Sequence, residues 1–379
     1  MVGVARDLSG CRAMAYARNM TYPLIRATGT PTEIGHAYGE QAADLIAGNL
    51  EDYRQKFAAV GLDRAQATEL GEQFGETTRA YAPRIAATLD AVAEASGVAT
   101  GDIYALNART ELMLPTGLQI TECTGVAVLP EHTASGDTLL AQNWDWHPTQ
   151  QPYTVVLATR DERGHEIVSL AEAGMLAKTG LNSAGVGVCV NLIHSDRDGV
   201  LGGVPYHVLI RFVLDQPDGL AASLKVTSLP RSASINLIVA AAGGTAVDLE
   251  VAPGLVGRIL PTDGLLVHAN HFESGIAVVD AIYDTGGSSL FRDQRLRQVL
   301  AGPAADRKVL VDDVIAGLQD HLGFPYAICR HVNDADPDDL KSISAASVVM
   351  NLDEREFLYS SGPPCESPYE RVDLATVFG

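Results

Sequence analysis

The sequence predicts an α+β protein in which two β-sheets pack together and are covered by helices. Three observations predict this class. Residues 23–122 are mainly helical in pattern, short apolar and β-branched runs follow from Cys123 at intervals of about ten residues, and helical patterns separate groups of these runs. The 379 residues contain no internal repeat or flexible linker. We therefore expect one compact unit, with a mainly helical segment 1–122 and a sheet-rich part 123–379.

The N-terminal helices are marked by their start signals. Thr30 offers a capping hydroxyl, Pro31 occupies the first helical position, and Glu33 completes a capping box. A helix over 34–50 follows from this start. Further helices are expected over 65–95, with a break at Pro83, and over 102–112.

The later part of the chain alternates strand and helix patterns. Ten runs predict strands: 124–129, 138–143, 153–159, 166–170, 185–193, 235–240, 246–251, 265–269, 347–352 and 356–359. Helical patterns lie between them at 206–214, 219–226, 289–300 and 309–318. Ten strands are enough for two sheets, and the helices between them can cover the outer faces.

Charge and hydropathy narrow the classes of partner. The chain has 47 acidic and 27 basic side chains and a formal charge of -20. Binding to nucleic acid or an anionic membrane needs clustered Lys and Arg, and no such cluster is present. The longest apolar stretches, around 186–193 and 235–242, are too short to span a bilayer. The first twenty residues lack the apolar core of a secretory signal, so a cytoplasmic protein acting on a small molecule is expected.

Cysteine and histidine spacing predicts neither a disulfide framework nor a metal site. The five cysteines form no CxxC pair and have no histidine at zinc-ligand spacing. His268 and His271 form an H-x-x-H pair on an expected strand and turn, without a third ligand nearby. Nucleotide-binding glycine loops and the HExxH and GxSxG motifs are absent. No metal and no cofactor are expected. The cysteines are Cys11, Cys123, Cys189, Cys329 and Cys365.

Cys123 stands out because the expected hairpin brings a carboxylate near it. The strand that starts at Cys123 and the next strand are joined by a polar connection over 131–137. A turn centred near Ala134 places Asp145 or Trp146 opposite Cys123 in an antiparallel register.

Several motifs in order carry a family resemblance. They are 27–31 (Ala-Thr-Gly-Thr-Pro), 39–41 (Gly-Glu-Gln), 122–124 (Glu-Cys-Thr), 142–146 (Gln-Asn-Trp-Asp-Trp), 180–185 (Gly-Leu-Asn-Ser-Ala-Gly), 268–272 (His-Ala-Asn-His-Phe) and 361–366 (Ser-Gly-Pro-Pro-Cys-Glu). Over residues 23–370 the chain resembles the acyl-coenzyme A:6-aminopenicillanate acyltransferase (isopenicillin N acyltransferase) family. The resemblance implies a cysteine N-terminal-nucleophile hydrolase with a four-layer αββα fold.

The resemblance also implies that the protein is made as an inactive precursor that cuts itself between Glu122 and Cys123. The parts 1–122 and 123–379 then stay associated as two chains, and the new α-amine of Cys123 becomes part of the active site. An α-amine with a pKa near 7.7–8.0 can take a proton from the thiol at neutral pH, so no histidine base is needed.

The matching motifs assign roles to further residues. Asp145 would orient the α-amine of Cys123, and Asn270 would stabilise the oxyanion of a tetrahedral intermediate. Asn191 resembles the position of a second oxyanion donor in related bile-salt and penicillin V acylases. Trp144 and Trp146 would form core or pocket wall.

One position departs from the family pattern. Ser342 matches a family serine, but the arginine expected after it is Ile343 in this chain. Arg330 is a candidate replacement for that anion contact.

Three classes of function stay open. The first is a self-processing cysteine amidase that forms a Cys123 acyl-thioester from an N-acyl or β-alanyl-type amide and passes the acyl group to water, or, as an acyltransferase, to an amine such as 6-aminopenicillanate. The second is a silent binding protein on the same fold. The third is an unprocessed thiol hydrolase with His271 or His268 as the base. The substrate would be a small amide or acyl-thioester, and a homo-oligomer is compatible with all three classes.

Overall fold

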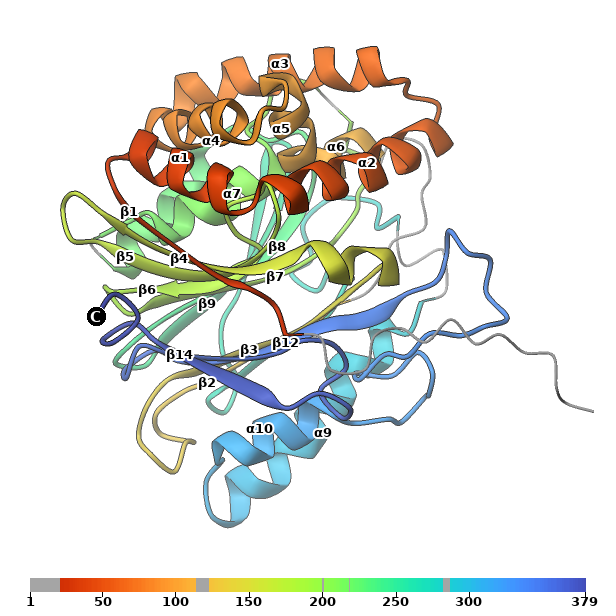
Figure 1. The fold of residues 1–379 in the computed structure, drawn as a ribbon. Coiled ribbons are helices and arrows are strands. Elements are labelled where there is room, and N and C mark those ends of the chain that lie inside the picture. Colours follow the sequence, from red (N-terminus) through yellow and green to blue (C-terminus); the bar gives the residue numbers. More distant parts are fainter. Residues whose placement is uncertain (1–20, 114–122, 200, 218, 282–286) are drawn as a thin grey trace, which may run out of the picture.

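Two β-sheets lie face to face between two layers of helices (Figure 1). The computed structural model describes residues 21–113, 123–199, 201–217, 219–281 and 287–379. The arrangement of two sheets between two layers of helices confirms the expected four-layer αββα sandwich. In the described part of the chain, no helix is both long enough and apolar enough to cross a membrane.

The helices form two layers on opposite sides of the molecule (Figure 1). One layer contains α1 (Pro31–Gln41), α2 (Ala43–Ala59), α3 (Arg64–Tyr81), α4 (Pro83–Ser96), α5 (Thr100–Asn107), α6 (Arg109–Met113) and α7 (Tyr206–Leu214), with the short α8 (Leu220–Ser223) following α7. The other layer contains α9 (Ser289–Asp306) and α10 (Val311–Leu318). Two 3-10 helices, η2 (Pro148–Tyr153) and η3 (Leu224–Ser228), complete the helical elements described.

The sheet next to the N-terminal helices has eight strands in the described part of the chain. Their order is β1 (Leu24–Gly29), β4 (Thr154–Asp161), β5 (Glu166–Glu172), β6 (Thr179–Asn182), β7 (Val186–Asn191), β8 (Ile235–Ala241), β9 (Thr245–Ala252) and β10 (Leu255–Ile259). Among the strand pairs that the structure describes in this sheet, only β1–β4 is parallel.

Within the described residues, the second sheet has six strands, all paired antiparallel. Their order is β11 (Leu265–His268), β2 (Thr124–Val128), β3 (Leu139–Trp146), β12 (Ile343–Asn351), β13 (Glu356–Ser360) and β14 (Tyr369–Asp373). Because β2 lies between β11 and β3, Cys123, which directly precedes β2, has a neighbouring strand on each side.

The ten expected strands are all present, and the described residues form four further strands that the sequence pattern did not predict. Three of the four, β1, β10 and β14, are edge strands, whose mixed burial gives a weak pattern. The fourth, β6, has only four residues. The capping box at Thr30 and the break at Pro83 are confirmed. The helices expected over 34–50 and 102–112 are each divided in two.

The two faces of β2 pack against different parts of the core, and this shows to which side the Cys123 side chain points. Val126 and Val128 pack with leucines of α9 and α10 in one hydrophobic cluster. Ala127 and Cys123 belong to the larger cluster, which includes the eight-stranded sheet and the N-terminal helices. Because side chains alternate along a strand, this places Cys123 on the face between the sheets.

The hairpin register differs from the expected one. Thr124 lies opposite Asn143, so the next pair along is Cys123 with Trp144, not with Asp145 or Trp146. The connection is set by tertiary contacts that a local turn argument does not contain. Leu129 N donates to Gly264 O at 2.9 Å, and Ala134 N donates to Val309 O at 2.9 Å.

Gly71 of α3 allows a close approach to α5. A Cβ atom at Gly71 would lie 1.9 Å from the carbonyl oxygen of Gly101. We expect Gly71→Ala to lower the free energy of unfolding by about 1–3 kcal/mol or more, because backbone must move. Gly302→Ala in α9 is the matched control, since a Cβ there meets nothing within 4 Å. Urea unfolding midpoints should fall for the first variant and hold or rise for the second; equal midpoints would contradict the packing argument.

Candidate active site

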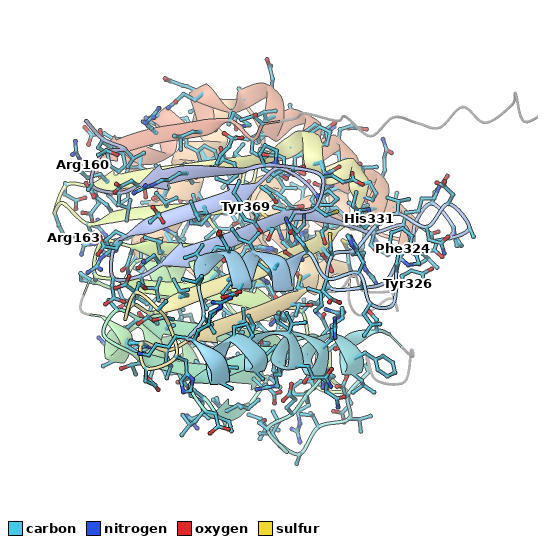
Figure 2. The ribbon with its side chains drawn as sticks, turned by 90° about the horizontal axis from the view of Figure 1, so that it is seen from below. Arg160, Arg163, Phe324, Tyr326, His331 and Tyr369 are labelled. Atoms are coloured by element: carbon cyan, nitrogen blue, oxygen red, sulfur yellow. The ribbon has the colours of Figure 1, made fainter. Side chains whose placement is uncertain are left out.

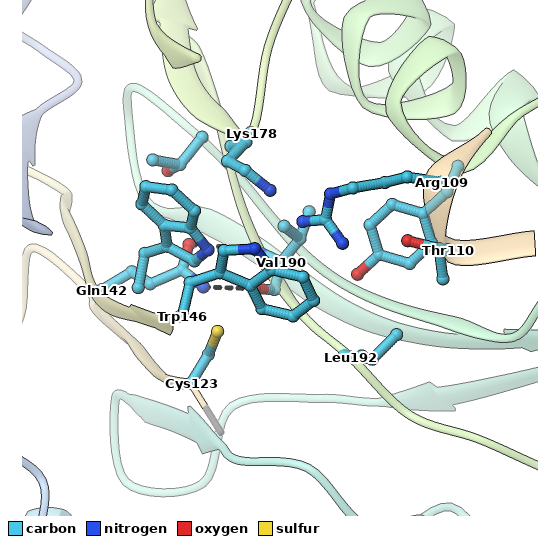
Figure 3. A pocket seen from close by; sticks show the side chains of 11 residues that line it. Arg109, Thr110, Cys123, Gln142, Trp146, Lys178, Val190 and Leu192 are labelled. Carbon is cyan, nitrogen blue, oxygen red and sulfur yellow. Dashed lines mark hydrogen bonds between the residues drawn. The ribbon is translucent and has the colours of Figure 1, made fainter. Parts of the chain in front are cut away.

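Cys123 is buried at the start of β2, with 6% of its surface exposed. Its sulfur faces a cavity and points toward the Trp146 ring, with Lys178 and Arg109 beyond it (Figure 3). The backbone nitrogen of Cys123 donates a hydrogen bond of 2.8 Å to Asn270 Oδ1. Glu122, the expected residue before the cut, lies outside the described residues.

The β2–β11 pairing explains why Asn270 reaches Cys123. His268 of β11 lies opposite Gly125, and continuing this register by two residues brings Asn270 opposite Cys123. The side chain of Asn270 is fixed from both ends. Its Oδ1 also accepts from Arg292 at 2.9 Å, and its Nδ2 donates to Leu192 O at 2.8 Å. Asn270 thus contacts the atom that would become the α-amine, a contact that the sequence interpretation gave to Asp145.

Arg292 of α9 is a site residue that sequence reasoning missed. Its guanidinium is buried and donates to the carbonyl oxygen of Cys123 and to Thr124 Oγ1. Together with its bond to Asn270, it holds the backbone on both sides of the nucleophile. The sequence carries no signal for this role, because Arg292 is one of three arginines in an ordinary helical pattern.

Asp145, Arg330 and Ser342 come together near the start of β12. Asp145 Oδ1 accepts from Ser344 Oγ at 2.7 Å, and Asp145 Oδ2 lies 4.0 Å from Arg330 Nε. Arg330 Nη1 donates to Ser342 Oγ at 3.4 Å. The guanidinium of Arg330 is therefore close to Ser342. Position 343, directly after this serine, is the one where the family pattern has an arginine and this chain has Ile343. The main-chain oxygen of Asp145 lies 4.0 Å from the sulfur of Cys123.

Asn191 is at the end of β7, between two residues that line the cavity, Val190 and Leu192. Its Nδ2 donates to Asn236 Oδ1 at 2.8 Å. Asn236 is its cross-strand neighbour on β8. The expected oxyanion role of Asn191 stays a prediction, and the amide would have to leave this bond to perform it.

The cavity has an aromatic and apolar wall with charged groups at one side. It encloses about 410 Å³, including its open mouth. Trp144 and Trp146 are in the wall, where the sequence interpretation put them. The lining residues are Arg109, Thr110, Cys123, Gln142, Trp144, Trp146, Lys178, Thr179, Val190, Leu192 and Tyr206.

Two cations share one buried carboxylate beside this cavity. Glu172 Oε2 lies 3.0 Å from Lys178 Nζ and 3.2 Å from Arg109 Nε, and Tyr53 OH donates to Glu172 Oε1 at 2.6 Å. All three charged groups are buried. Burial opposes ionisation of Glu172, but Arg109 and Lys178 keep its pKa below the usual value. The group has an excess of one positive charge when Lys178 is protonated.

Burial lowers the pKa of Lys178 to about 8, and Arg109 adds to the effect. Lys178 Nζ also lies 3.2 Å from His207 Nε2, and burial keeps the pKa of His207 well below its usual value. Lys178 is therefore mostly charged at pH 7 and loses its proton just above that. No sequence motif singled out Lys178, Arg109 or Glu172.

The thiol of Cys123 needs a base. Burial, with the Asp145 carboxylate adding to it, raises the pKa of the thiol to about 12. At pH 7 only about one thiol in 10⁵ is then ionised. A reaction through this sulfur therefore requires a nearby proton acceptor.

The two histidines considered as bases have other partners. His268 lies 2.9 Å from Glu250 Oε1; although burial opposes it, Asp248 and Glu250 raise the pKa of His268 to about 9. His271 Nδ1 lies 2.8 Å from Ser289 Oγ. Within the described part of the chain, neither lines the cavity at Cys123. These contacts count against the unprocessed thiol hydrolase.

Comparison with known proteins bears on this geometry. Residues 132–354 match the model of the family described as acyl-coenzyme A:6-aminopenicillanic acid acyl-transferase. The chain belongs to this family. It is an enzyme of the C–N amide hydrolase or N-acyltransferase kind.

The individual proteins that resemble this chain have low sequence identity to it. The chain is 26% identical over 316 residues to the 40 kDa form of acyl-coenzyme A:6-aminopenicillanic-acid-acyltransferase of Emericella nidulans, which covers 81% of this chain and 84% of the relative. Among solved structures, a variant of the conjugated bile acid hydrolase of Clostridium perfringens is 11% identical, with a TM-score of 0.47 over 67% of this chain and 92% of its own. Penicillin V acylase of Agrobacterium tumefaciens is 13% identical, with a TM-score of 0.44 over 67% and 87%.

Proposed function

We propose that the protein is a self-processing cysteine amidase that forms an acyl-thioester on Cys123. The observation that carries the proposal is the position of Cys123, whose sulfur faces the cavity while its nitrogen is held by Asn270. A free amine at that nitrogen would lie on the same residue as the thiol. It would supply the base that a buried thiol of pKa about 12 needs.

Processing follows from the same groups. The thiol of Cys123 adds to the carbonyl carbon of Glu122, the C–N bond breaks, and the nitrogen of Cys123 takes up the thiol proton. Water then hydrolyses the thioester, which leaves a carboxylate on Glu122 and restores the thiol. The parts 1–122 and 123–379 stay joined by non-covalent packing, because α1–α6 share a hydrophobic core with the sheets.

Turnover repeats this chemistry on a substrate. The α-amine of Cys123 takes the thiol proton, and the sulfur attacks the substrate's amide carbonyl. The amide C–N bond breaks, and the leaving amine takes the proton from the α-ammonium group. Water then attacks the thioester and passes a proton to the α-amine. The C–S bond breaks, the sulfur takes the proton from the α-ammonium group, and the acid leaves. Asn270 and Arg292 hold the reacting residue, and Asp145 with Arg330 is a positioning pair beside it.

The charge at the cavity supports a substrate class. Lys178 and Arg109 face the space in front of Cys123, and among the residues that the structure describes they share a single carboxylate, Glu172. A buried excess of positive charge is complementary to an anionic ligand group. We therefore assign a substrate that carries a carboxylate near its scissile amide, with an apolar or aromatic part against Trp144 and Trp146.

Transfer of the acyl group to an amine is the second candidate, and the family supports it. Both the family description and the Emericella nidulans relative are acyltransferases. Hydrolysis and transfer use the same acyl-thioester and differ only in the acceptor. Added amines such as 6-aminopenicillanate would divert product from acid to amide if transfer operates; an unchanged yield of acid would leave hydrolysis alone.

Intact-mass spectrometry of the purified protein tests the processing step. We expect two chains, 1–122 and 123–379, with Cys123 as the first residue of the second chain. They should elute together from a sizing column under native conditions and separate under denaturing conditions. A single uncut chain after prolonged incubation, with full amidase activity, would overturn the mechanism and favour the unprocessed thiol hydrolase. An uncut and inactive chain would favour the binding protein.

A further inference from the structure

Four side chains that can bind a metal converge away from the candidate active site. They are His321, Cys329, His331 and Cys365, and their ligating atoms all lie within 4.8 Å of one another. The first three lie on the segment between α10 and β12, and Cys365 lies between β13 and β14. Figure 2 shows His331 next to Phe324 and Tyr326, beyond the helices at one edge of the molecule.

The separations of the four atoms fit a tetrahedral zinc site. Cys329 Sγ lies 3.5 Å from Cys365 Sγ, and His321 Nε2 lies 3.1 Å from His331 Nε2. His331 Nε2 lies 3.6 Å from Cys329 Sγ and 3.3 Å from Cys365 Sγ. Zinc bonds of about 2.3 Å to sulfur and about 2.0–2.1 Å to nitrogen imply ligand separations of about 3.3–3.8 Å in a tetrahedron. The four measured separations are within about 0.3 Å of this geometry.

The surroundings also orient the ligands. His331 Nδ1 lies 3.5 Å from Glu366 Oε1, next to the ligand Cys365, and Nε2 faces the cluster. A carboxylate on the second nitrogen is the common arrangement around metal-bound histidine. The backbone nitrogen of Cys329 donates to Asp320 O at 3.0 Å, which fixes the cysteine next to the end of α10. The ring of Phe324 lies 5.2 Å from that of His331.

We propose that His321, Cys329, His331 and Cys365 bind one zinc ion. Two thiolates and two imidazoles make a closed four-ligand set, so the ion has a structural role and no open position for substrate. It joins the segment after α10 to the segment after β13. Arg330 directly follows the ligand Cys329 and lies 4.0 Å from Asp145, so the ion also anchors the segment that carries Arg330. This inference does not depend on the proposed reaction.

The test is metal content and metal titration of the full chain. We expect the purified protein to contain about one zinc ion per chain, and the chelator-treated protein to take up one Co²⁺ with the visible spectrum of a tetrahedral thiolate site. Cys365→Ser and His321→Ala should each weaken Zn²⁺ binding by at least about tenfold. Both positions are exposed, so folding should survive. His36→Ala on α1 is the matched control, since His36 contacts Glu94 and should leave metal content unchanged.

Three results would overturn the zinc site. The first is a chain that holds no metal and shows no uptake of Zn²⁺ or Co²⁺ after reduction. The second is metal content that is equal in the wild type and in both ligand variants. The third is a Cys329–Cys365 disulfide in the freshly purified protein that persists under mild reduction, detected by peptide mapping without prior reduction.

Discussion

Cys123→Ala is expected to yield a single uncut chain with amidase activity reduced to background. The substitution removes both the atom that attacks the carbonyl of Glu122 and the atom that would carry the acyl group. Loss of a nucleophile in an acyl-transfer enzyme costs on the order of 10⁴–10⁶ in kcat. Intact mass and turnover of a small amide, measured on the same preparation, check both effects.

Two variants separate the chemistry from loss of a buried sulfur. Cys189→Ala removes another fully buried thiol in the neighbouring sheet and should leave cleavage and turnover near wild type. Cys123→Ser keeps a hydroxyl and should cut slowly, because the alcohol is a weaker nucleophile than the thiol. Normal cleavage in Cys123→Ala would sink the proposal, since no other atom of that residue can perform the shift.

Lys178→Met is expected to reduce kcat/KM for a carboxylate-bearing amide by about 10–100-fold, since a charge-assisted hydrogen bond is worth roughly 1.5–3 kcal/mol. The matching neutral amide should change little, because the variant keeps the length and apolar surface of the side chain. Glu172 keeps Arg109 and Tyr53 as partners, so folding should survive. Kinetics with the paired substrates measure the effect.

Lys56→Met is the control for Lys178→Met. Lys56 is a partly buried lysine with a carboxylate partner, Asp52, but it does not line the cavity of Cys123. It should leave the preference between the two amides unchanged. An equal loss for the charged and the neutral substrate in Lys178→Met would contradict an anion-binding role and indicate a structural one.

The same pair of substrates predicts a pH dependence. The pKa of Lys178 is lowered to about 8, so the cation is present below that pH and is lost as the pH rises through it. The ratio of kcat/KM for the charged over the neutral amide should therefore fall between about pH 7 and 9. The α-amine titrates in this range too, but it acts on both substrates and cancels in the ratio. In Lys178→Met the ratio should be flat.

The local pattern of the chain was enough for most of the elements. The capping box at Thr30, the break at Pro83 and the ten expected strands follow from residues close in sequence. Strand propensity and apolar patterning do not reveal strands that are only partly buried, such as β1 and β14 at the sheet edges. It also fails for the register of the hairpin after Cys123, because contacts from Gly264 and Val309 shape its connection.

The amino-acid sequence alone was enough to predict the fold class and the family resemblance, and to select Cys123, Asp145 and Asn270 as candidate site residues, because local periodicity and short motifs carry these signals. The contacts that those residues make depend on the tertiary structure. Asn270 meets the nitrogen of Cys123 only because β11 pairs with β2. The buried charged group of Lys178, Arg109 and Glu172 is likewise assembled from separate elements.

The proposed zinc ligands are invisible to sequence spacing for the same reason. Zinc motifs record ligands that are neighbours in sequence, whereas Cys365 reaches Cys329 from 36 residues away. Strand pairing and loop packing bring such distant side chains together through contacts summed over the whole core, and no local pattern of residues records that sum.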